Sequence, residues 1–277
     1  MRKLIVSVAV GTALVAVPAA PASAAGPKPP TVKAAAGLLS LNGKTIWKSN
    51  ATARRPIASL AKVMTVVVVL REEKNLDRPV KIKRKYTTYG DKWGATEARL
   101  IVGDRVKVRD LMYGTMLESG ADAAAALADT YGPGYDAFVK KMNREAKRLG
   151  LKNTKYANFD GLPYPSQYST YSTAAEQVKL GRYALRFPTL KKVIATKKVT
   201  VRSLNGRSYT WKNTNTLIGK YKGGLGIKTG YTSKAGYCLL FAAERGKKTQ
   251  IGVVLGSPTP GRRFTDATRL LNWGFGV

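Results

Sequence analysis

Ser59 and Lys62 stand three positions apart at the head of a long apolar run, ASLAKVMT at 58–65. On a helix, positions i and i+3 share a face, so the Ser59 hydroxyl and the Lys62 amine can meet. A serine beside a neutral amine is a nucleophile with its own base. The chain contains no histidine, so a Ser-His-Asp triad is excluded and serine chemistry must use another base.

These residues also have a purely structural explanation. Ser59 is of a type that often caps the start of a helix, and S-x-x-K is short enough to arise by chance. Ser119 and Asp122 fit a capping pair ahead of an apolar helix, and residues 228–230 (KTG) could be a strand edge before a turn. A catalytic interpretation therefore needs these three segments together.

The length and charge of the chain limit what it can be. Its 277 residues can bury a large core, as one big domain or two lobes. A balance of 48 basic and 16 acidic residues gives a net charge of +32, which attracts polyanions such as nucleic acid, anionic lipid or an anionic cell wall. With no histidine and the single Cys238, neither an intramolecular disulfide nor a usual zinc site can form. We expect no metal and no cofactor, and a buried, inert Cys238 thiol.

The N-terminus has the pattern of an export signal. Arg2 and Lys3 precede an apolar stretch that reaches about Val17, and Ala-Ser-Ala follows at 22–24. This arrangement predicts a signal peptide over 1–24; the alternative is a short membrane anchor, although the apolar stretch is too short to span a bilayer. Export makes cell-wall or membrane polymers, rather than nucleic acid, the expected partners of the basic surface.

Strand signals occur at both ends of the chain and helix signals between them. We expect strands at 36–41, 44–48, 225–230, 237–244 and 250–256, and helices at 59–74, 123–129, 135–149, 173–185 and 265–273. Asn-Gly pairs at 42–43 and 205–206 predict hairpins. The valines at 66–69 favour a strand by propensity, but the length and the charged end of the segment favour a buried helix.

This order predicts an α+β fold: an antiparallel sheet built from both chain ends and flanked by helices, with a mostly helical insertion. A Pro-rich leader covers 25–34 and one domain covers 35–277. We expect a sheet lobe over about 35–75 and 200–277, and a helical lobe over about 76–199.

Taken in order, S59-x-x-K62, S119-G-A121 and K228-T-G230 resemble the S-x-x-K, S-x-N and K-T-G motifs of penicillin-binding proteins and related β-lactamases. The run KTGYTSKAGYC at 228–238 is similar to the K-T-G-x-T-x-x-A-G-x-C pattern of exported D-alanyl-D-alanine carboxypeptidases. The resemblance extends over about 35–275 and includes NFDGL at 158–162 and NTN at 213–215.

The resemblance implies a serine-type carboxypeptidase that removes the terminal D-alanine of peptidoglycan stem peptides and is inhibited covalently by β-lactams. It implies that Ser59 attacks the substrate, Lys62 takes its proton and Ser119 relays a proton to the leaving group. Burial and the neighbouring Lys228 would keep the Lys62 amine neutral. The implied substrate-binding residues are Lys228, Thr229, Gly230, Tyr231, Thr232 and Arg263, with an oxyanion hole formed by the backbone N–H groups of Ser59 and Tyr231.

One residue departs from the pattern. Ala121 stands where the second motif carries a side-chain amide, so we predict slower turnover or altered substrate positioning rather than loss of acylation.

Two other functions fit part of the sequence. A secreted β-lactamase would need a loop glutamate to activate water, but Glu145 and Glu176, the only glutamates between Ser119 and Lys228, lie in predicted helices. A catalytically degenerate protein that binds the wall through its basic surface is the other alternative. No amphipathic anchor follows the closing helix up to Val277, so we expect a secreted, extracytoplasmic protein associated with the cell wall by charge.

Overall fold

The computed structural model describes residues 4, 5, 7 and 27–277. The predicted signal peptide, apart from residues 4, 5 and 7, and its cleavage site therefore lie outside the described residues. The strands are β1 (Ala36–Leu41), β2 (Lys44–Ser49), β3 (Arg55–Pro56), β4 (Pro79–Lys81), β5 (Arg105–Lys107), β6 (Tyr171–Ser172), β7 (Lys198–Arg202), β8 (Ser208–Lys212), β9 (Gly224–Thr232), β10 (Gly236–Arg245) and β11 (Lys248–Ser257). The helices are α1 (Lys62–Glu72), α2 (Arg84–Thr87), α3 (Val108–Met116), α4 (Ala121–Tyr131), α5 (Tyr135–Arg148), α6 (Ala174–Ala184), α7 (Pro188–Ala195) and α8 (Pro260–Phe275), with short 3₁₀ turns η1 (Ala58–Ala61) and η2 (Asp91–Trp93).

The main sheet joins the two ends of the chain. Its five strands have the order β2-β1-β11-β10-β9, and every neighbouring pair is antiparallel. The N-terminal hairpin β1–β2 turns at Asn42 and Gly43, which both have positive φ, the geometry that an Asn-Gly turn favours. The predicted α+β fold with a sheet from both ends is confirmed.

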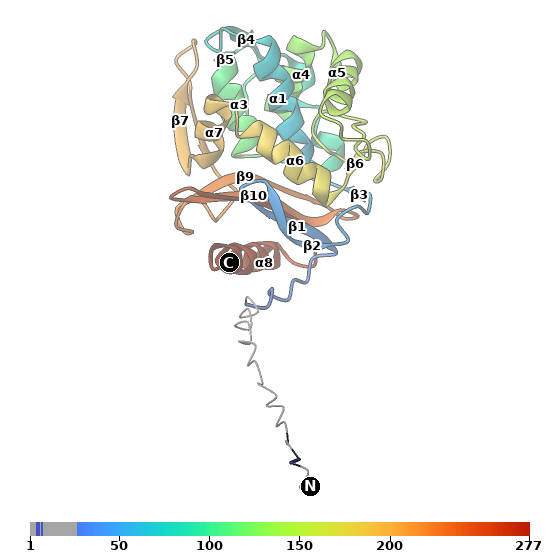
Figure 1. The fold of residues 1–277 in the computed structure, drawn as a ribbon. Coiled ribbons are helices and arrows are strands. Elements are labelled where there is room, and N and C mark those ends of the chain that lie inside the picture. Colours follow the sequence, from blue (N-terminus) through green and yellow to red (C-terminus); the bar gives the residue numbers. More distant parts are fainter. Residues whose placement is uncertain (1–3, 6, 8–26) are drawn as a thin grey trace.

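Helices cover both faces of this sheet (Figure 1). The helix α8 packs on β10 and β11 on one side, while α6 and α7 pack on the other side against β11, β1 and β9. The apolar layer between α8 and the sheet contains Leu39, Phe241 and Val254 from the strands and Leu270 from α8. The helices α1, α3, α4 and α5 and the hairpin β4–β5 lie beyond α6 and α7 in Figure 1, and the strand β7, which pairs with β8, runs beside α7. The predicted division into a sheet lobe and a helical lobe stays a prediction.

The helix α1 runs through the interior. Residues 62–70 are all buried, and α1 contacts α3, α4, α5 and α6. A helix that is apolar all round must be surrounded by protein, and this explains why β-branched valines are accepted in it. The prediction of a buried helix rather than a strand is confirmed.

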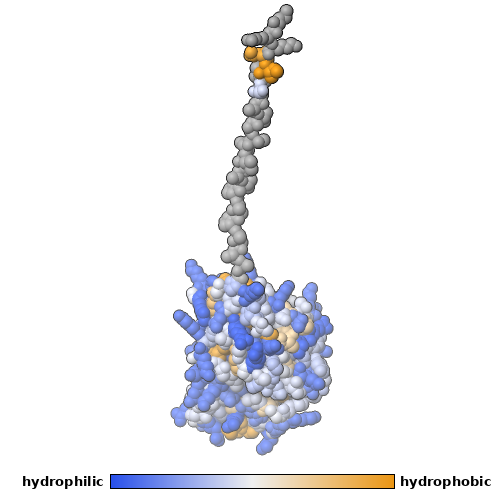
Figure 2. All heavy atoms as spheres, turned by 90° about the horizontal axis from the view of Figure 1, so that it is seen from below, coloured by the Kyte–Doolittle hydropathy of each residue, from blue (hydrophilic) through white to orange (hydrophobic). Residues whose placement is uncertain are grey.

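The surface is largely hydrophilic on the face that Figure 2 shows, with small apolar areas between the polar side chains. Among the described residues, none of the helices combines the length and the apolar character needed to span a bilayer. The Cys238 thiol is buried, as predicted, and donates to the backbone oxygen of Ala235 at 3.6 Å. Burial raises its pKa to about 11.

Candidate active site

Ser59 lies in the 3₁₀ turn η1, immediately before α1. The turn is tight, since Ala58 adopts a left-handed φ of 47°, which a non-glycine residue rarely takes. Neither η1 nor α1 has a side-chain cap, and their N-cap residues are Ile57 and Ala61. The Ser59 hydroxyl is therefore not used as a helix cap.

Lys62 is the partner of that hydroxyl. Its Nζ donates to Ser59 Oγ at 3.2 Å and to the backbone oxygen of Asp160 at 3.0 Å. Lys62 is only 1% exposed. Burial lowers the pKa of the Lys62 amine, although the carboxylates of Asp160 and Asp122 oppose this effect. A buried amine with a lowered pKa next to a serine hydroxyl can act as a general base.

The two residues open into a cleft of about 410 Å³. The cleft residues come from η1, α1, η2 and the segment after it, the loop before α4, the loop at 162–163, the loop after β8, the strand β9 with the residue after it, and α8. They are Ser59, Lys62, Trp93, Gly94, Ala95, Thr96, Ser119, Leu162, Pro163, Thr214, Thr229, Gly230, Tyr231, Thr232, Ser233 and Arg263. All three segments that the sequence singled out thus meet at one place.

The strand β9 forms one wall of the cleft and approaches η1 closely. A Cβ atom on Gly230 would lie 3.0 Å from Ser59 N and 3.2 Å from the Ala58 Cβ. Lys228, two residues earlier, is 1% exposed and does not line the cleft. Burial, followed by the positive charges of Lys62 and Arg263, holds its pKa well below the usual value. Because side chains alternate along a strand, Lys228 is on the same face of β9 as Gly230, the face that approaches η1.

Ser119 reaches the cleft from a strained loop. It has a φ of 67°, and Gly120 is the N-cap of α4, which has no side-chain cap. Asp122 does not pair with Ser119, because its carboxylate accepts from the backbone N–H groups of Ala98 and Leu100 at 2.7 and 2.9 Å. Ala121 is fully buried and does not line the cleft.

Arg263 enters the cleft from α8. Its Nη1 donates to the backbone oxygens of Gly230 and Cys238 at 3.1 and 3.4 Å, so its guanidinium is held under β9. The adjacent Arg262 instead pairs with Asp266 at 3.0 Å. Of the two neighbouring arginines, Arg263 is thus the one at the cleft.

The family model of D-alanyl-D-alanine carboxypeptidases, Peptidase_S11, matches residues 24–259. This chain belongs to that family. A D-alanyl-D-alanine carboxypeptidase of Streptomyces sp. (strain K15) is 42% identical over 262 residues, which cover 90% of this chain and 89% of that protein. The D-alanyl-D-alanine carboxypeptidase DacF of Bacillus subtilis (strain 168) is 33% identical over 236 residues, 84% of this chain but 59% of its own length.

Solved structures agree with this family membership. The crystal structure of the Streptomyces K15 DD-transpeptidase superposes with a TM-score of 0.86 at 42% identity, and the match covers 90% of this chain and all of that one. The fold of this family member is therefore the one seen in penicillin-binding enzymes of that type.

The aromatic residue Trp93 lines the cleft and was not predicted from the sequence. Trp93 packs against Tyr89 and Tyr164 with ring centroids 5.8 and 5.4 Å apart. Thr214 was part of a motif that the sequence analysis noted, but not as a site residue; its hydroxyl lies 2.7 Å from that of Thr229. Scattered aromatic residues in a loop carry no spacing signal, so only the fold could bring them to the cleft.

None of the residues that line the cleft is acidic. Glu145, on α5, forms ion pairs with Arg71 and Arg148. Glu176, on α6, accepts a hydrogen bond from the Asn153 N–H. The loop glutamate that a β-lactamase of the expected kind would use is therefore missing from the described cleft residues.

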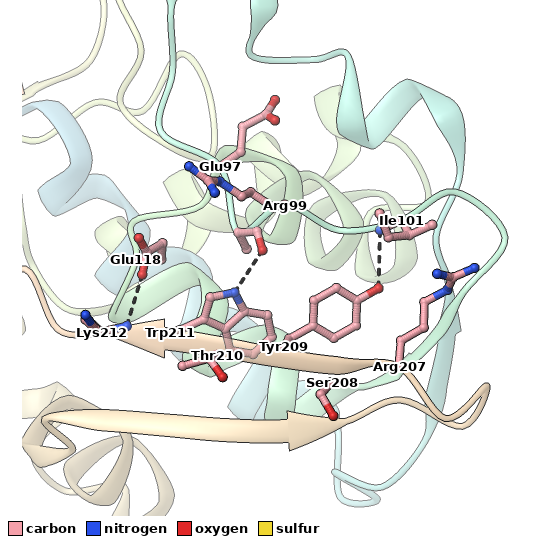
Figure 3. Close-up of a pocket in the computed structure, with 11 residues that line it drawn as sticks. Glu97, Arg99, Ile101, Glu118, Arg207, Ser208, Tyr209, Thr210, Trp211 and Lys212 are labelled. Carbon is pink, nitrogen blue, oxygen red and sulfur yellow. Dashed lines mark hydrogen bonds between the residues drawn. The ribbon is translucent and has the colours of Figure 1, made fainter.

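A larger cavity, about 630 Å³, lies between β8 and residues 97–101 (Figure 3). Trp211 donates there to the oxygen of Ala98, and Tyr209 accepts from the Ile101 N–H. Its lining contains Ser208, but no lysine hydrogen-bonded to that serine among the described residues. The nucleophile–base pair is a feature of the Ser59 cleft.

Proposed function

We propose that this family member is a serine-type carboxypeptidase that removes the terminal D-alanine of peptidoglycan stem peptides and is inhibited by penicillin. The hydrogen bond between Lys62 Nζ and Ser59 Oγ at 3.2 Å in an open cleft is the observation that supports it. It is the arrangement that nucleophilic catalysis without histidine requires.

In the first step Ser59 Oγ attacks the carbonyl carbon between the two D-alanines. The hydroxyl proton passes to Lys62 Nζ, and the C–N bond then breaks, leaving an acyl-enzyme on Ser59. The departing D-alanine amine receives a proton through Ser119, which lines the same cleft. Water then cleaves the ester, with Lys62 again as the base.

The negative charge that develops on the substrate carbonyl oxygen during the attack is stabilised by hydrogen-bond donors held at a fixed position. The backbone N–H groups of Ser59 and Tyr231 are the proposed pair. The close approach of Gly230 to Ser59 N supports this assignment, because it brings β9 next to the nucleophile's own backbone. Preorganised donors of this kind contribute about 2.7–4 kcal/mol to the stabilisation of a transition state.

The free carboxylate of the substrate requires positive charge and hydroxyl groups. We assign Thr229, Thr232 and Arg263, which line the cleft, to direct contact. Lys228 is buried next to Thr229, and its Nζ donates to the Thr229 backbone oxygen at 3.1 Å; we assign it to substrate binding at the same end of the cleft. The absence of acidic residues among those lining the cleft supports an anionic ligand.

An action on peptidoglycan implies an extracytoplasmic location. We propose that the chain is exported by its N-terminal signal and held near the wall by its +32 charge, with anionic wall or membrane polymers as partners.

Release of D-alanine from a synthetic stem pentapeptide tests the reaction. We expect release by the parent enzyme, none above background by Ser59→Ala, and parent-level release by Ser208→Ala, the matched serine of the second cavity. Release that persists in Ser59→Ala would contradict the assignment of the nucleophile, and no release by the parent would contradict the function.

A further inference from the structure

The amine of Lys62 is held by one residue besides Ser59. Asp160, 98 positions later, accepts a hydrogen bond from Nζ through its backbone oxygen at 3.0 Å. Its carboxylate oxygen Oδ2 lies 4.0 Å from the same nitrogen, and the side chains of both residues are buried, at 2% and 0% exposure. Two oxygens of Asp160 thus face the proposed base.

The loop that carries Asp160 is locked in place. The Asn158 amide donates to the backbone oxygens of Leu162 and Tyr164 at 2.8 and 2.6 Å, and its Oδ1 accepts from the Gly161 N–H at 2.7 Å. Gly161 has a φ of 83°, and a Cβ atom there would lie 1.9 Å from the Ala58 oxygen. The loop is therefore docked against the residue that precedes Ser59.

The carboxylate of Asp160 is incompletely bonded. Oδ1 accepts from the Leu162 N–H at 3.2 Å and from the Tyr89 hydroxyl at 3.5 Å. Oδ2 is buried and has no hydrogen-bond partner within the described part of the chain. A buried carboxylate oxygen without a donor is costly, and the nearby Lys62 amine can relieve that cost when it carries an extra proton.

No other charged group near Lys62, among the described residues, offers its amine a carboxylate oxygen without a hydrogen-bond partner. Asp122 is bonded to the backbone N–H groups of Ala98, Leu100 and Ala123, and Lys228 is an amine that offers Lys62 no negative charge. The Tyr89 hydroxyl donates to Asp160, whereas that of Tyr135 donates to the backbone oxygen of Lys85. Burial raises the pKa of both hydroxyls, so both are neutral near pH 7. Burial also raises the pKa of Asp160 itself, and Lys62 opposes that shift.

We propose that Asp160 is the positioning residue of Lys62: it orients the amine toward Ser59 and stabilises the ammonium that forms when the amine takes the Ser59 proton. The proposal rests on the proposed function. A nucleophile, a base and a third group that orients the base form the general logic of a catalytic triad. During acylation one proton moves from Ser59 Oγ to Lys62 Nζ, the ammonium is held by Asp160, and the proton later passes toward the leaving amine.

The pH profile of acylation by benzylpenicillin tests this role in Asp160→Asn. Acylation rises with pH as Lys62 loses its proton. Without the carboxylate, which raises the Lys62 pKa, this rise should move to lower pH. The plateau rate constant should fall about tenfold or more, because the ammonium is less stabilised.

Asp104→Asn is the matched control. Asp104 is also buried, at 2% exposure, and accepts from the Tyr209 hydroxyl at 2.6 Å away from the cleft. We expect it to lower the melting temperature while the midpoint of the pH profile stays unchanged. Tyr89→Phe provides a second variant if Asp160→Asn does not fold: loss of its hydrogen bond makes Asp160 less anionic, so the midpoint should move in the same direction by a smaller amount.

If the parent enzyme is acylated and the pH profile of Asp160→Asn is unshifted, this proposal is overturned, but the proposed function is not. Equal losses of rate in Asp160→Asn and Asp104→Asn with no shift in either would overturn it in the same way. If Asp160→Asn does not fold, an unshifted profile in Tyr89→Phe would overturn it as well. A parent enzyme that is not acylated would overturn the proposed function, and this proposal with it.

Discussion

At the scale of single residues, burial separates two lysines from the rest of a very basic chain. Lys62 and Lys228 are each 1% exposed, whereas most of the other Lys and Arg side chains reach solvent. Burial lowers the pKa of both amines, because the charged ammonium form loses the water that stabilises it when it is buried in protein. Only Lys62 combines this with a hydrogen bond to a serine hydroxyl, within the residues that the structure describes.

The effect of an amide side chain at position 121 can be predicted at this scale. We expect Ala121→Asn to raise D-alanine release about 2- to 10-fold, because an amide can add one hydrogen bond to the substrate or to Lys62. Ala121 is fully buried, so the larger side chain should also lower the free energy of unfolding by about 1–3 kcal/mol. Peptide turnover and chemical denaturation measure the two effects. Unchanged D-alanine release would contradict the idea that Ala121 limits the reaction.

The sequence predicts which residues line this site better than it predicts the contacts between them. Short motifs identified Ser59, Lys62 and Ser119 because chemistry restricts residue type and spacing. The contact between Lys62 and Asp160 joins positions 98 apart, and no local pattern encodes it. The burial of Lys228 on the face of β9 that approaches η1 likewise depends on the packing of the sheet, and not on the K-T-G sequence itself.

At the scale of elements, the approach of β9 to η1 sets the geometry of the site. We expect Gly230→Ala to slow acylation by benzylpenicillin about tenfold, because its Cβ would lie 3.0 Å from Ser59 N and must displace η1. Gly261→Ala on α8, where a Cβ would meet nothing within 4 Å, is the control and should keep the parent rate. Equal rates for the parent and Gly230→Ala would show that this contact does not position the nucleophile.

The long elements and both Asn-Gly hairpins, β1–β2 and β7–β8, were predictable, whereas two short helices were not. The five strands of the sheet and the helices α4, α5, α6 and α8 appear close to their predicted ranges. The helices α3 and α7 were missed, although Pro188 at the first position of α7 is a typical helix start. The segments are 9 and 8 residues long, so their apolar periodicity covers few turns and contacts with the rest of the protein decide their structure.

At the scale of the whole molecule, charge predicts where the protein resides. With a net charge of +32, we expect the protein to sediment with cell walls that retain their anionic polymers and to be released as the salt concentration rises from about 0.05 to 1 M. Walls stripped of these polymers are the control and should bind less. Attachment that resists salt, or equal binding to stripped walls, would contradict a charge-based association.

The proposed function depends on Ser59, activated by Lys62, as the nucleophile of this family member. The most direct test is the intact mass of the protein after incubation with benzylpenicillin, followed by peptide mapping. We expect a lasting adduct of one penicillin on Ser59 and no adduct on Ser59→Ala. An adduct on another residue, consumption of the drug without a lasting adduct, or no reaction at all would contradict it.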